Sequence, residues 1–358
     1  MTLPTARTPP TSKTSAANPA AAANPAPRRT RVAALVAAAA AATVGLTGCG
    51  LGNAMVGVHA APPEVTTGAP LSAAGAQTIA DRVLNAAAAA AKVSGANGDK
   101  QRAAVMTGSA LALATAASKL PAASEPTGQP VEKPAAPKVL AVSRGRSWPR
   151  AMFVETTRDD GSQTLSLLTC EGANSQFKVA ASATMQPGTS VPALDPFTSG
   201  SAANPDTKGL IGQPDALLSE YAAAVAYPNP KAPEHFDLGA DQFATVLRRN
   251  AAAQAKALGS LARFTQRHTV DPKQLFAFRL HSGGVVVFAL MKRTDTLKLK
   301  PKGKALTPSA DLARLLKKKK LTKSATISTY ESVVFTVPTQ GKAAMVAADE
   351  QLISATGS

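Results

Sequence analysis

Apolar residues follow a helical spacing and then a strand spacing along this chain, and the same order occurs twice. In the first part, Ile79 and Val83 mark a helical pattern that begins near residue 76. After a polar break, a second helical pattern that includes Met106 runs to about Leu120, and a proline-rich segment at 121–137 ends it. The spacing therefore predicts two helices ahead of the first strands.

Alternating apolar and polar residues follow these helices. They predict strands over 151–157, 164–170 and 176–184, because a strand with one buried face places every second side chain in the core. Asp160 and Gly161 form a turn signal between the first two strands, since both residues favour tight turns. The segment is therefore predicted to be an antiparallel meander.

The second half of the chain repeats this order. A helical spacing begins at Pro214, and another runs from about residue 240 to Leu258. A segment rich in proline, glycine and serine at 186–213 separates the two halves and predicts a linker. Five further strands are expected, at 262–269, 274–280, 285–299, 326–337 and 342–352.

Two helices followed by an antiparallel sheet, occurring twice, indicate a tandem α+β protein. A pair of helices can bury its apolar stripe against one face of such a sheet, which gives a two-layer domain. We therefore predict domains at 76–185 and 214–355, joined by the linker at 186–213. The element order resembles the cone-shaped NTF2-like and cystatin-like folds.

The N-terminal region has the order of an export signal. Arg28, Arg29 and Arg31 precede an apolar run at 32–44, which is shorter than the about 20 residues that a membrane-spanning helix needs. The two arginines at 28–29 also leave the twin-arginine export route open. Residues 1–27 are either a long cytoplasmic leader or the product of a start codon placed too early.

The apolar run ends in Leu46-Thr47-Gly48-Cys49. This motif resembles the lipobox of bacterial lipoproteins, and the resemblance implies cleavage before Cys49, diacylation of its thiol and acylation of the new amine. The alternative is an ordinary signal peptide with a chance cysteine. In the lipoprotein interpretation, residues 1–48 are leader and signal peptide, and 49–75 form a flexible tether.

Composition limits how the core is built. Only 4% of the residues are aromatic while 45% are hydrophobic, so the core must consist mainly of alanine, valine and leucine. These side chains bury less area each than aromatic rings do. Removal of residues 1–48 lowers the net charge from +17 to +12 and leaves 310 residues, a length that suggests two domains.

The sequence contains none of the common catalytic or cofactor-binding motifs. We therefore predict that the protein is not an enzyme and has no cofactor and no metal site. His59 falls in the tether and His235 in a loop. His268 and His281 fall on neighbouring predicted strands, but a hairpin with its turn at 270–273 would separate them by about 20 Å, at ~3.3 Å per residue. His268 is therefore expected at the surface, without a catalytic partner.

The second cysteine of the chain is Cys170. If Cys49 carries lipid, Cys170 has no partner for an internal disulfide. Because Cys170 ends an apolar predicted strand, we expect a buried and unreactive thiol.

A basic segment between Lys292 and Lys323 is the strongest feature of the mature chain. It holds twelve Lys and Arg residues against two Asp residues, a net charge of +10. A short helix capped by Ser309 is expected within it. The helix would be followed directly by an uninterrupted run of Lys317, Lys318, Lys319 and Lys320.

This lysine run has three interpretations. The first is a loop kept solvated by its own charge. The second is a contact with anionic lipid headgroups or anionic wall polymers. The third, nucleic acid, is disfavoured because no aromatic residues for base stacking are interleaved with the lysines.

The stretch from Trp148 to Leu194 carries a family resemblance. Its Trp-Pro-Arg at 148–150, its Leu-Ser-Leu-Leu at 165–168 and its Phe-Lys-Val-Ala at 177–180 are similar to uncharacterised lipoproteins of high-GC Gram-positive bacteria, which carry a domain of unknown function. The resemblance covers about residues 140–355. It implies two linked domains outside the membrane, and it implies no activity.

Together these features predict a lipid-anchored protein on the outer face of the cell membrane. We expect a non-enzymatic role in binding or scaffolding at the cell envelope, with the membrane as partner through the lipid. The alternative is a small-molecule carrier or sensor that uses an apolar pocket inside a cone-shaped sheet.

Overall fold

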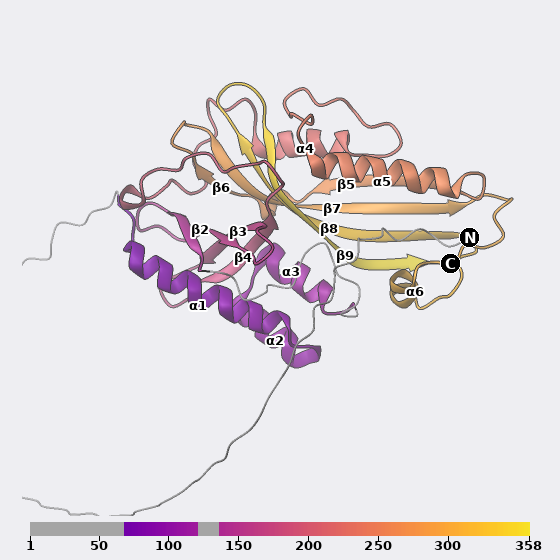
Figure 1. The fold of residues 1–358 in the computed structure, drawn as a ribbon, viewed down its shortest axis with the longest axis horizontal. Helices are drawn as coiled ribbons and strands as arrows, with labels where there is room; N and C mark the ends of the chain where they lie inside the picture. The colour runs from indigo at the N-terminus through magenta and orange to yellow at the C-terminus, as the bar shows by residue number, and fades with distance from the viewer. Residues whose placement is uncertain (1–67, 121–135) are drawn as a thin grey trace, which may run out of the picture. The chain divides into compact units, whose positions relative to one another are not determined.

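Two antiparallel sheets, one of four strands and one of five, form the framework of the described chain (Figure 1). The computed structural model describes residues 68–120 and 136–358, and these belong to one compact unit. Helices precede each sheet in the chain, so the predicted α+β class is confirmed. Cys49, the leader and signal peptide at 1–48, and the predicted tether up to residue 67 lie outside the described residues.

The first half of the described chain contributes three helices and the four-stranded sheet, whose order is β1-β2-β3-β4. The predicted meander is confirmed as β2 to β4. The sequence analysis missed β1, because five residues are too few for an alternation to stand out. The bounds are α1 (Ala73–Ala91), α2 (Gly95–Val105), α3 (Gly108–Ala117), β1 (Lys138–Val142), β2 (Arg150–Thr157), β3 (Gln163–Cys170) and β4 (Lys178–Thr184).

Helix α1 is the amphipathic helix that the spacing predicts. The hydroxyl of Ser72 caps it by accepting a hydrogen bond from the backbone N–H of Gly75 at 3.1 Å. Its buried face is mostly alanine, and it packs against Met152 and Leu168 of the sheet. Alanine lets the helix lie close to the strands, which suits a core poor in aromatic residues.

The single helix predicted up to Leu120 is wrong, because the structure divides it into α2 and α3. Met106 is extended and forms a β-bridge with Val179, and the N–H of Thr107 donates to the carbonyl of Val179 at 2.8 Å. Gly108 then opens α3 with a φ of +52°, which favours glycine. Pairing with strand β4 therefore overrides a continuous helical spacing.

The second half contributes the five-stranded sheet and three further helices among the described residues. The bounds are α4 (Pro214–Ala224), α5 (Gln242–Leu258), β5 (Ala262–Val270), β6 (Phe276–Arg279), β7 (Val285–Leu299), α6 (Ala310–Leu316), β8 (Ser324–Val337) and β9 (Ala344–Gly357). Short 3-10 helices lie at η1 (Phe197–Ser199) and η2 (Pro272–Gln274). All of the strands predicted here are present; the strand at 285–299 coincides with β7, and the others have shifted ends.

The pairing of β5 differs from the predicted hairpin. Strand β5 pairs with β7, so that His268 lies opposite Arg293, and β6 pairs with another part of β7. The 3-10 turn η2 displaces the chain between β5 and β6, which prevents them from pairing with each other. The sheet order is therefore β5-β7-β8-β9, with β6 beside β7.

Helices α4 and α5 cover one face of the five-stranded sheet (Figure 1). Leu218 and Tyr221 of α4 and Leu247 of α5 are buried against strand residues such as Phe335. Phe236, from the connection between the two helices, packs with its ring 5.7 Å from the ring of Phe335. This apolar layer fixes the helices over the strands.

The opposite face of the five-stranded sheet packs against the four-stranded sheet. Phe153 of β2 lies 5.1 Å from Phe288 of β7 in an edge-to-face contact and 5.9 Å from Phe278 of β6. These rings belong to one hydrophobic cluster that both sheets line. No observation tests whether 76–185 and 214–355 fold separately, and this shared core favours unfolding in one transition.

The segment at 186–213 connects the two halves of the chain, and it also pairs with both. Ser201 forms a β-bridge with Ser143, beside the four-stranded sheet, while Leu194 and Ala203 form bridges with Leu280 and Phe278. Its proline and glycine content therefore indicates irregular backbone rather than an extended tether.

Candidate functional site

Five charged or titratable side chains lie together on the helix-covered face of the five-stranded sheet. His268 comes from β5, Arg293 and Asp295 from β7, Glu331 from β8 and Glu350 from β9. The strand register brings them to one level, because His268 pairs with Arg293 and Glu331 pairs with Glu350. We call this group the charged cluster. It separates two hydrophobic clusters on the same face.

Short contacts join the members of the charged cluster. His268 Nδ1 lies 2.8 Å from Glu331 Oε2, and both side chains are 0% exposed. Arg293 Nη1 donates to Glu350 Oε2 at 2.5 Å and to Glu331 Oε1 at 3.4 Å. Arg293 Nε also lies 3.2 Å from Asp295 Oδ2. One guanidinium therefore connects three carboxylates from three strands.

The burial of the cluster shows in the pKa of Asp295. Burial raises the pKa of Asp295 to about 6, although the charges of Arg293 and His268 act in the lowering direction. Burial alone would lower the pKa of Arg293, but Glu350, Asp295 and Glu331 outweigh it, and the pKa of the guanidinium is raised. The arginine therefore keeps its charge inside the protein.

His268 presents one of its ring nitrogens to no protein group. An ionised Glu331 carboxylate accepts a hydrogen bond, so it places a proton on Nδ1 of His268. The opposite nitrogen, Nε2, is buried and has no hydrogen-bond partner within the described residues. A neutral imidazole held in this way offers Nε2 as an acceptor, and a protonated one offers it as a donor.

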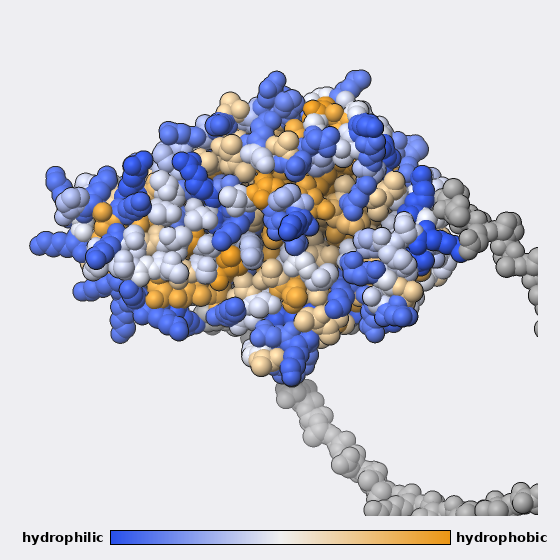
Figure 2. Space-filling view, turned by 180° about the vertical axis from the view of Figure 1, so that it is seen from behind, coloured by the Kyte–Doolittle hydropathy of each residue, from blue (hydrophilic) through white to orange (hydrophobic). Residues whose placement is uncertain are grey.

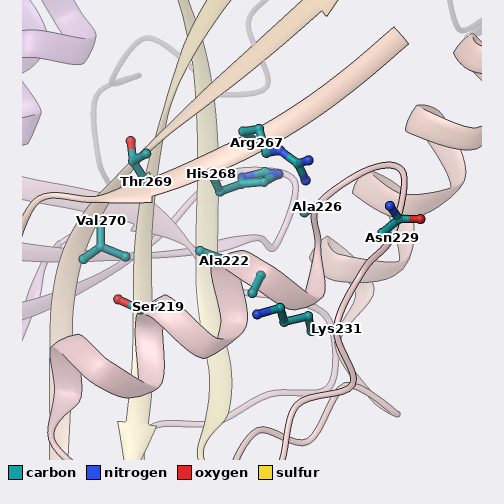
Figure 3. Close-up of a pocket in the computed structure, with 10 residues that line it drawn as sticks. Ser219, Ala222, Ala226, Asn229, Lys231, Arg267, His268, Thr269 and Val270 are labelled. Atoms are coloured by element: carbon teal, nitrogen blue, oxygen red, sulfur yellow. The ribbon is translucent and has the colours of Figure 1, made fainter. Parts of the chain in front are cut away.

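A pocket of about 380 Å³ lies against this histidine, between α4, the loop that follows α4, and strand β5 (Figure 3). Arg267 and His268 line it from the strand, and Lys231 lines it from the loop. The remaining lining is mostly small: Ser219, Ala222, Ala223, Ala226, Asn229, Thr269 and Val270. The pocket therefore combines two cationic side chains with an otherwise small lining.

The other histidines take part in separate contacts. His235 lies in the loop where it is expected, but its Nδ1 is 2.9 Å from Glu220 Oε2 and its backbone N–H donates to Glu220 Oε1. Although burial acts in the raising direction, these bonds lower the pKa of Glu220. His281 Nδ1 lies 3.4 Å from Asp195 Oδ1. His268 and His281 thus belong to different groups, and the expected surface position of His268 is wrong.

Cys170 is buried, as the sequence analysis predicts, with 4% of its surface exposed. Its thiol lies 3.2 Å from the carbonyl oxygen of Ser175 and 3.4 Å from that of Gly172, which it can reach as a donor. Its reactivity stays a prediction.

Most of the basic segment lies at one end of the five-stranded sheet, in the last residues of β7 and the connection to β8 (Figure 1), whereas Lys292 and Arg293 lie in the middle of β7. The short helix predicted there is confirmed as α6, which follows Ser309, but the Ser309 side chain makes no capping hydrogen bond. Eleven of the twelve basic residues are exposed, among them the four lysines of the run. The twelfth, Arg293, belongs to the buried charged cluster. We call the ten exposed basic residues from Lys298 to Lys323 the basic end.

A small hydrophobic base holds the basic end in place. Leu306 and Leu321 pair through two backbone hydrogen bonds of 2.9 Å, and both side chains are buried together with Leu316. Lys317 follows α6 in the left-handed conformation and directs the chain out of the helix. The lysine run is thus displayed on an anchored loop.

The sequence analysis missed Glu331 and Glu350, and it counted Arg293 as part of the basic segment. One signal was present: Glu331 stands in the long apolar strand pattern at 326–337, at a position that faces the core. A buried acid in such a strand requires a partner. The partner itself could not be found, because the pairing of β5 with β7 was not predicted.

A second buried carboxylate lies between the two sheets. Asp349 of β9 accepts hydrogen bonds from the backbone N–H and the hydroxyl of Thr184 in β4, at 3.0 and 3.2 Å. Burial raises the pKa of Asp349 to about 7, although both bonds act in the lowering direction. This contact ties the four-stranded sheet to the five-stranded one.

Within the described residues, no group of three or more His, Cys, Asp or Glu side chains is arranged to hold a metal, and no helix is long and apolar enough to cross a membrane.

Comparisons with known proteins identify the family of this chain. No curated protein and no solved structure matches the chain. The model of a family described as domain of unknown function (DUF8094) matches residues 72–357, and the chain belongs to this family.

Proposed function

We propose that this protein is anchored by lipid to the outer face of the cell membrane and that it binds an anionic surface of the cell envelope in a scaffolding role. The observation that carries this proposal is the basic end. In Figure 2, which views the molecule from behind, hydrophilic side chains project from the end of the five-stranded sheet where the connection from β7 to β8 lies.

The arrangement of the basic end supports a surface contact. The charges lie at the end of β7 and on the connection that follows it instead of being spread over the molecule, and Lys317–Lys320 are all exposed. The loop is anchored by Leu306 and Leu321, so that fewer residues must become ordered on binding. The carboxylates of the charged cluster pair with Arg293 and His268, and within the described residues they form no salt bridge with these lysines.

The electrostatic contributions of the individual lysines to surface binding add up. Each lysine near an anionic surface contributes roughly 1 kcal/mol, within a Debye length of about 8–10 Å. A lipid on Cys49 would hold the protein near such a surface, which raises the local concentration of the basic end. A contact that is weak for a free protein is then well populated.

Vesicle binding tests the proposal. A lipid-free chain that begins at residue 50 should bind anionic vesicles at low salt, and high salt should weaken this binding. Changing Lys317–Lys320 to glutamine should reduce the affinity at least about tenfold, since 1.4 kcal/mol corresponds to tenfold. Equal binding by both forms, or binding to neutral vesicles that ignores salt, contradicts the proposal.

A matched control tests whether binding depends on the position of the lysines or only on the total charge of the protein. Lys92, Lys100, Lys119 and Lys138 are also exposed and lie in the first half of the chain. Changing these four to glutamine removes the same charge but should leave the affinity within about twofold. If both quadruple variants lose affinity equally, only the net charge matters.

Lipid anchoring has its own test at Cys49, which lies outside the described residues. Replacing Cys49 with serine removes the thiol that would carry the diacylglycerol, so that the protein should leave the membrane fraction of the cell. A variant that stays in the membrane fraction with unchanged electrophoretic mobility contradicts lipidation.

The carrier or sensor remains the second candidate function. The pocket beside His268 favours it, because it combines cationic and polar groups at one place. This pocket differs from the apolar interior of a cone that the sequence analysis considered. The face between the helices and the strands is instead filled by apolar side chains on either side of the charged cluster.

A further inference from the structure

We propose that the pocket beside His268 is a binding site for a small oxyanion, a phosphate or carboxylate group on a molecule of metabolite size. The site is distinct from the basic end, because its residues come from β5, α4 and the loop after α4. The charge of the lining and the exposed edge of β5 support this site.

The two cations of the pocket have no acidic partner in the part of the chain that the structure describes. Lys231 and Arg267 form no salt bridge there, whereas other basic side chains, such as Arg144 and Arg293, do. Figure 3 shows Lys231 reaching toward α4 across the pocket from Arg267 and His268. Two unpaired cations facing one space favour an anion, and a guanidinium can bind a phosphate or carboxylate through two hydrogen bonds.

His268 lies at the inner side of the lining. Its side chain is 0% exposed and Nε2 is buried without a hydrogen-bond partner within the described residues, so a ligand in the pocket meets the main chain of His268 and not its ring. The residue as a whole is only half-buried, because its main chain is accessible. An anion bound beside it changes the electrostatic field at the imidazole without a direct contact.

The edge of β5 adds main-chain groups. Gln266 exchanges two backbone hydrogen bonds with Tyr227 in the loop after α4, at 2.8 and 3.0 Å, so its main-chain groups face away from β7. Because these groups alternate sides along a strand, those of His268 point to the same free edge. The loop that covers the edge at Gln266 therefore leaves it open at the pocket.

The charged cluster lies next to the site. Glu331 contacts His268 directly, and Asp295 and Glu350 contact Arg293 behind it. These carboxylates hold the imidazole but do not line the pocket. The small residues Ala222 and Ala226 leave room beside the cations for an apolar part of the ligand.

Calorimetric titration of the full chain in mild detergent, with inorganic phosphate and separately with citrate, tests the proposal at constant ionic strength. At least one probe should bind saturably at one site, and the probe that binds distinguishes a phosphate ligand from a carboxylate ligand. The double variant Lys231→Gln and Arg267→Gln should weaken this binding at least about tenfold. Saturable binding of neither probe, or unchanged binding by the variant, overturns the proposal.

Two controls exclude a general effect of charge. Arg263 on β5 and Lys273 in η2 are exposed and lie outside the pocket, and changing both to glutamine should leave the affinity within about twofold. The variant with glutamine at Lys317–Lys320 should also bind the probe normally, which separates this site from the basic end. An equal loss in the Arg263 and Lys273 control overturns the proposal.

An NMR measurement on the histidines tests whether the anion binds beside His268, without replacing a buried side chain. In protein labelled with ¹⁵N-histidine, the probe that binds should shift the imidazole signal of His268 saturably, with the affinity found by calorimetry. His235 and His281, which do not line the pocket, should not shift. Binding that leaves the His268 signal unmoved places the anion elsewhere and overturns the assignment.

Discussion

The charged cluster and the basic end lie on the same sheet, and strand β7 runs into both. Arg293 is buried among three carboxylates, whereas Lys298, only five residues further along the strand, is exposed to solvent. In the sequence the two belong to one basic segment. The role of a charge in this protein therefore depends on which face of the sheet it lies on and on its position along the strand. A buried charge sets stability, and an exposed one is available to partners.

The largest expected effect follows from removing the buried cation. Arg293→Ala leaves Glu331, Glu350 and Asp295 without their common partner, and breaking a buried ion pair in this way costs about 3–5 kcal/mol. Urea unfolding should therefore show a large loss of stability. Adding Glu331→Gln to this variant should restore part of it, because one uncompensated charge is removed. A loss below about 0.5 kcal/mol would place Arg293 with the exposed residues.

A loss of stability of similar size is expected from a change on the opposite face of the sheet. Phe153→Ala removes a fully buried ring that contacts Phe278 and Phe288 of the other sheet, which should cost about 3–5 kcal/mol. Because both sheets share this core, we expect the wild type to unfold in one transition. Val246→Ala, at an exposed position of α5, is the control and should change stability by less than about 0.5 kcal/mol. Two separate transitions, with only the first affected, would favour independent domains.

A smaller effect depends on pH and sharpens the contrast between buried and exposed acids. The pKa of Asp349 is about 7 in the folded protein, above its ordinary value of 3.8, so the folded state holds a proton that the unfolded state releases. Its contribution to stability is full below about pH 4 and is lost as the pH rises to about 7. Asp295, with a pKa of about 6, acts in the same direction.

Asp349→Asn should therefore reduce the fall in stability between pH 4 and 7, because asparagine does not ionise. Urea unfolding at several pH values measures this change. Asp159→Asn, at an exposed position in the hairpin turn between β2 and β3, should leave the pH profile as it is in the wild type. An unchanged profile in the Asp349 variant would mean that this carboxylate stays ionised when buried.

The smallest effect on stability is expected at the basic end. Changing Lys317–Lys320 to glutamine should alter the free energy of unfolding by less than about 0.5 kcal/mol, because all four side chains are exposed. The same variant is expected to lose vesicle binding, so stability and binding should separate. A loss of several kcal/mol would show that the run supports the fold.

The elements with long, regular patterns could be predicted from the sequence alone. The strand predicted at 285–299 coincides with β7, and the helical spacing from residue 76 falls within α1, because each has one continuous buried face. The exposure of the lysine run and the burial of Cys170 also followed from local pattern. Solvation and burial of this kind act residue by residue along one element, so they can be read without knowing its neighbours.

Which strands pair with each other could be seen only in the folded protein. The pairing of β5 with β7 brought His268 to Arg293, and the pairing of β8 with β9 brought Glu331 to Glu350. The break at Met106 arose in the same way, from a bridge to Val179. These contacts join residues far apart in the chain, and their energy comes from desolvated pairs that exist only after the sheet has formed. A charge count along the sequence therefore could not separate the buried arginine from the exposed lysines.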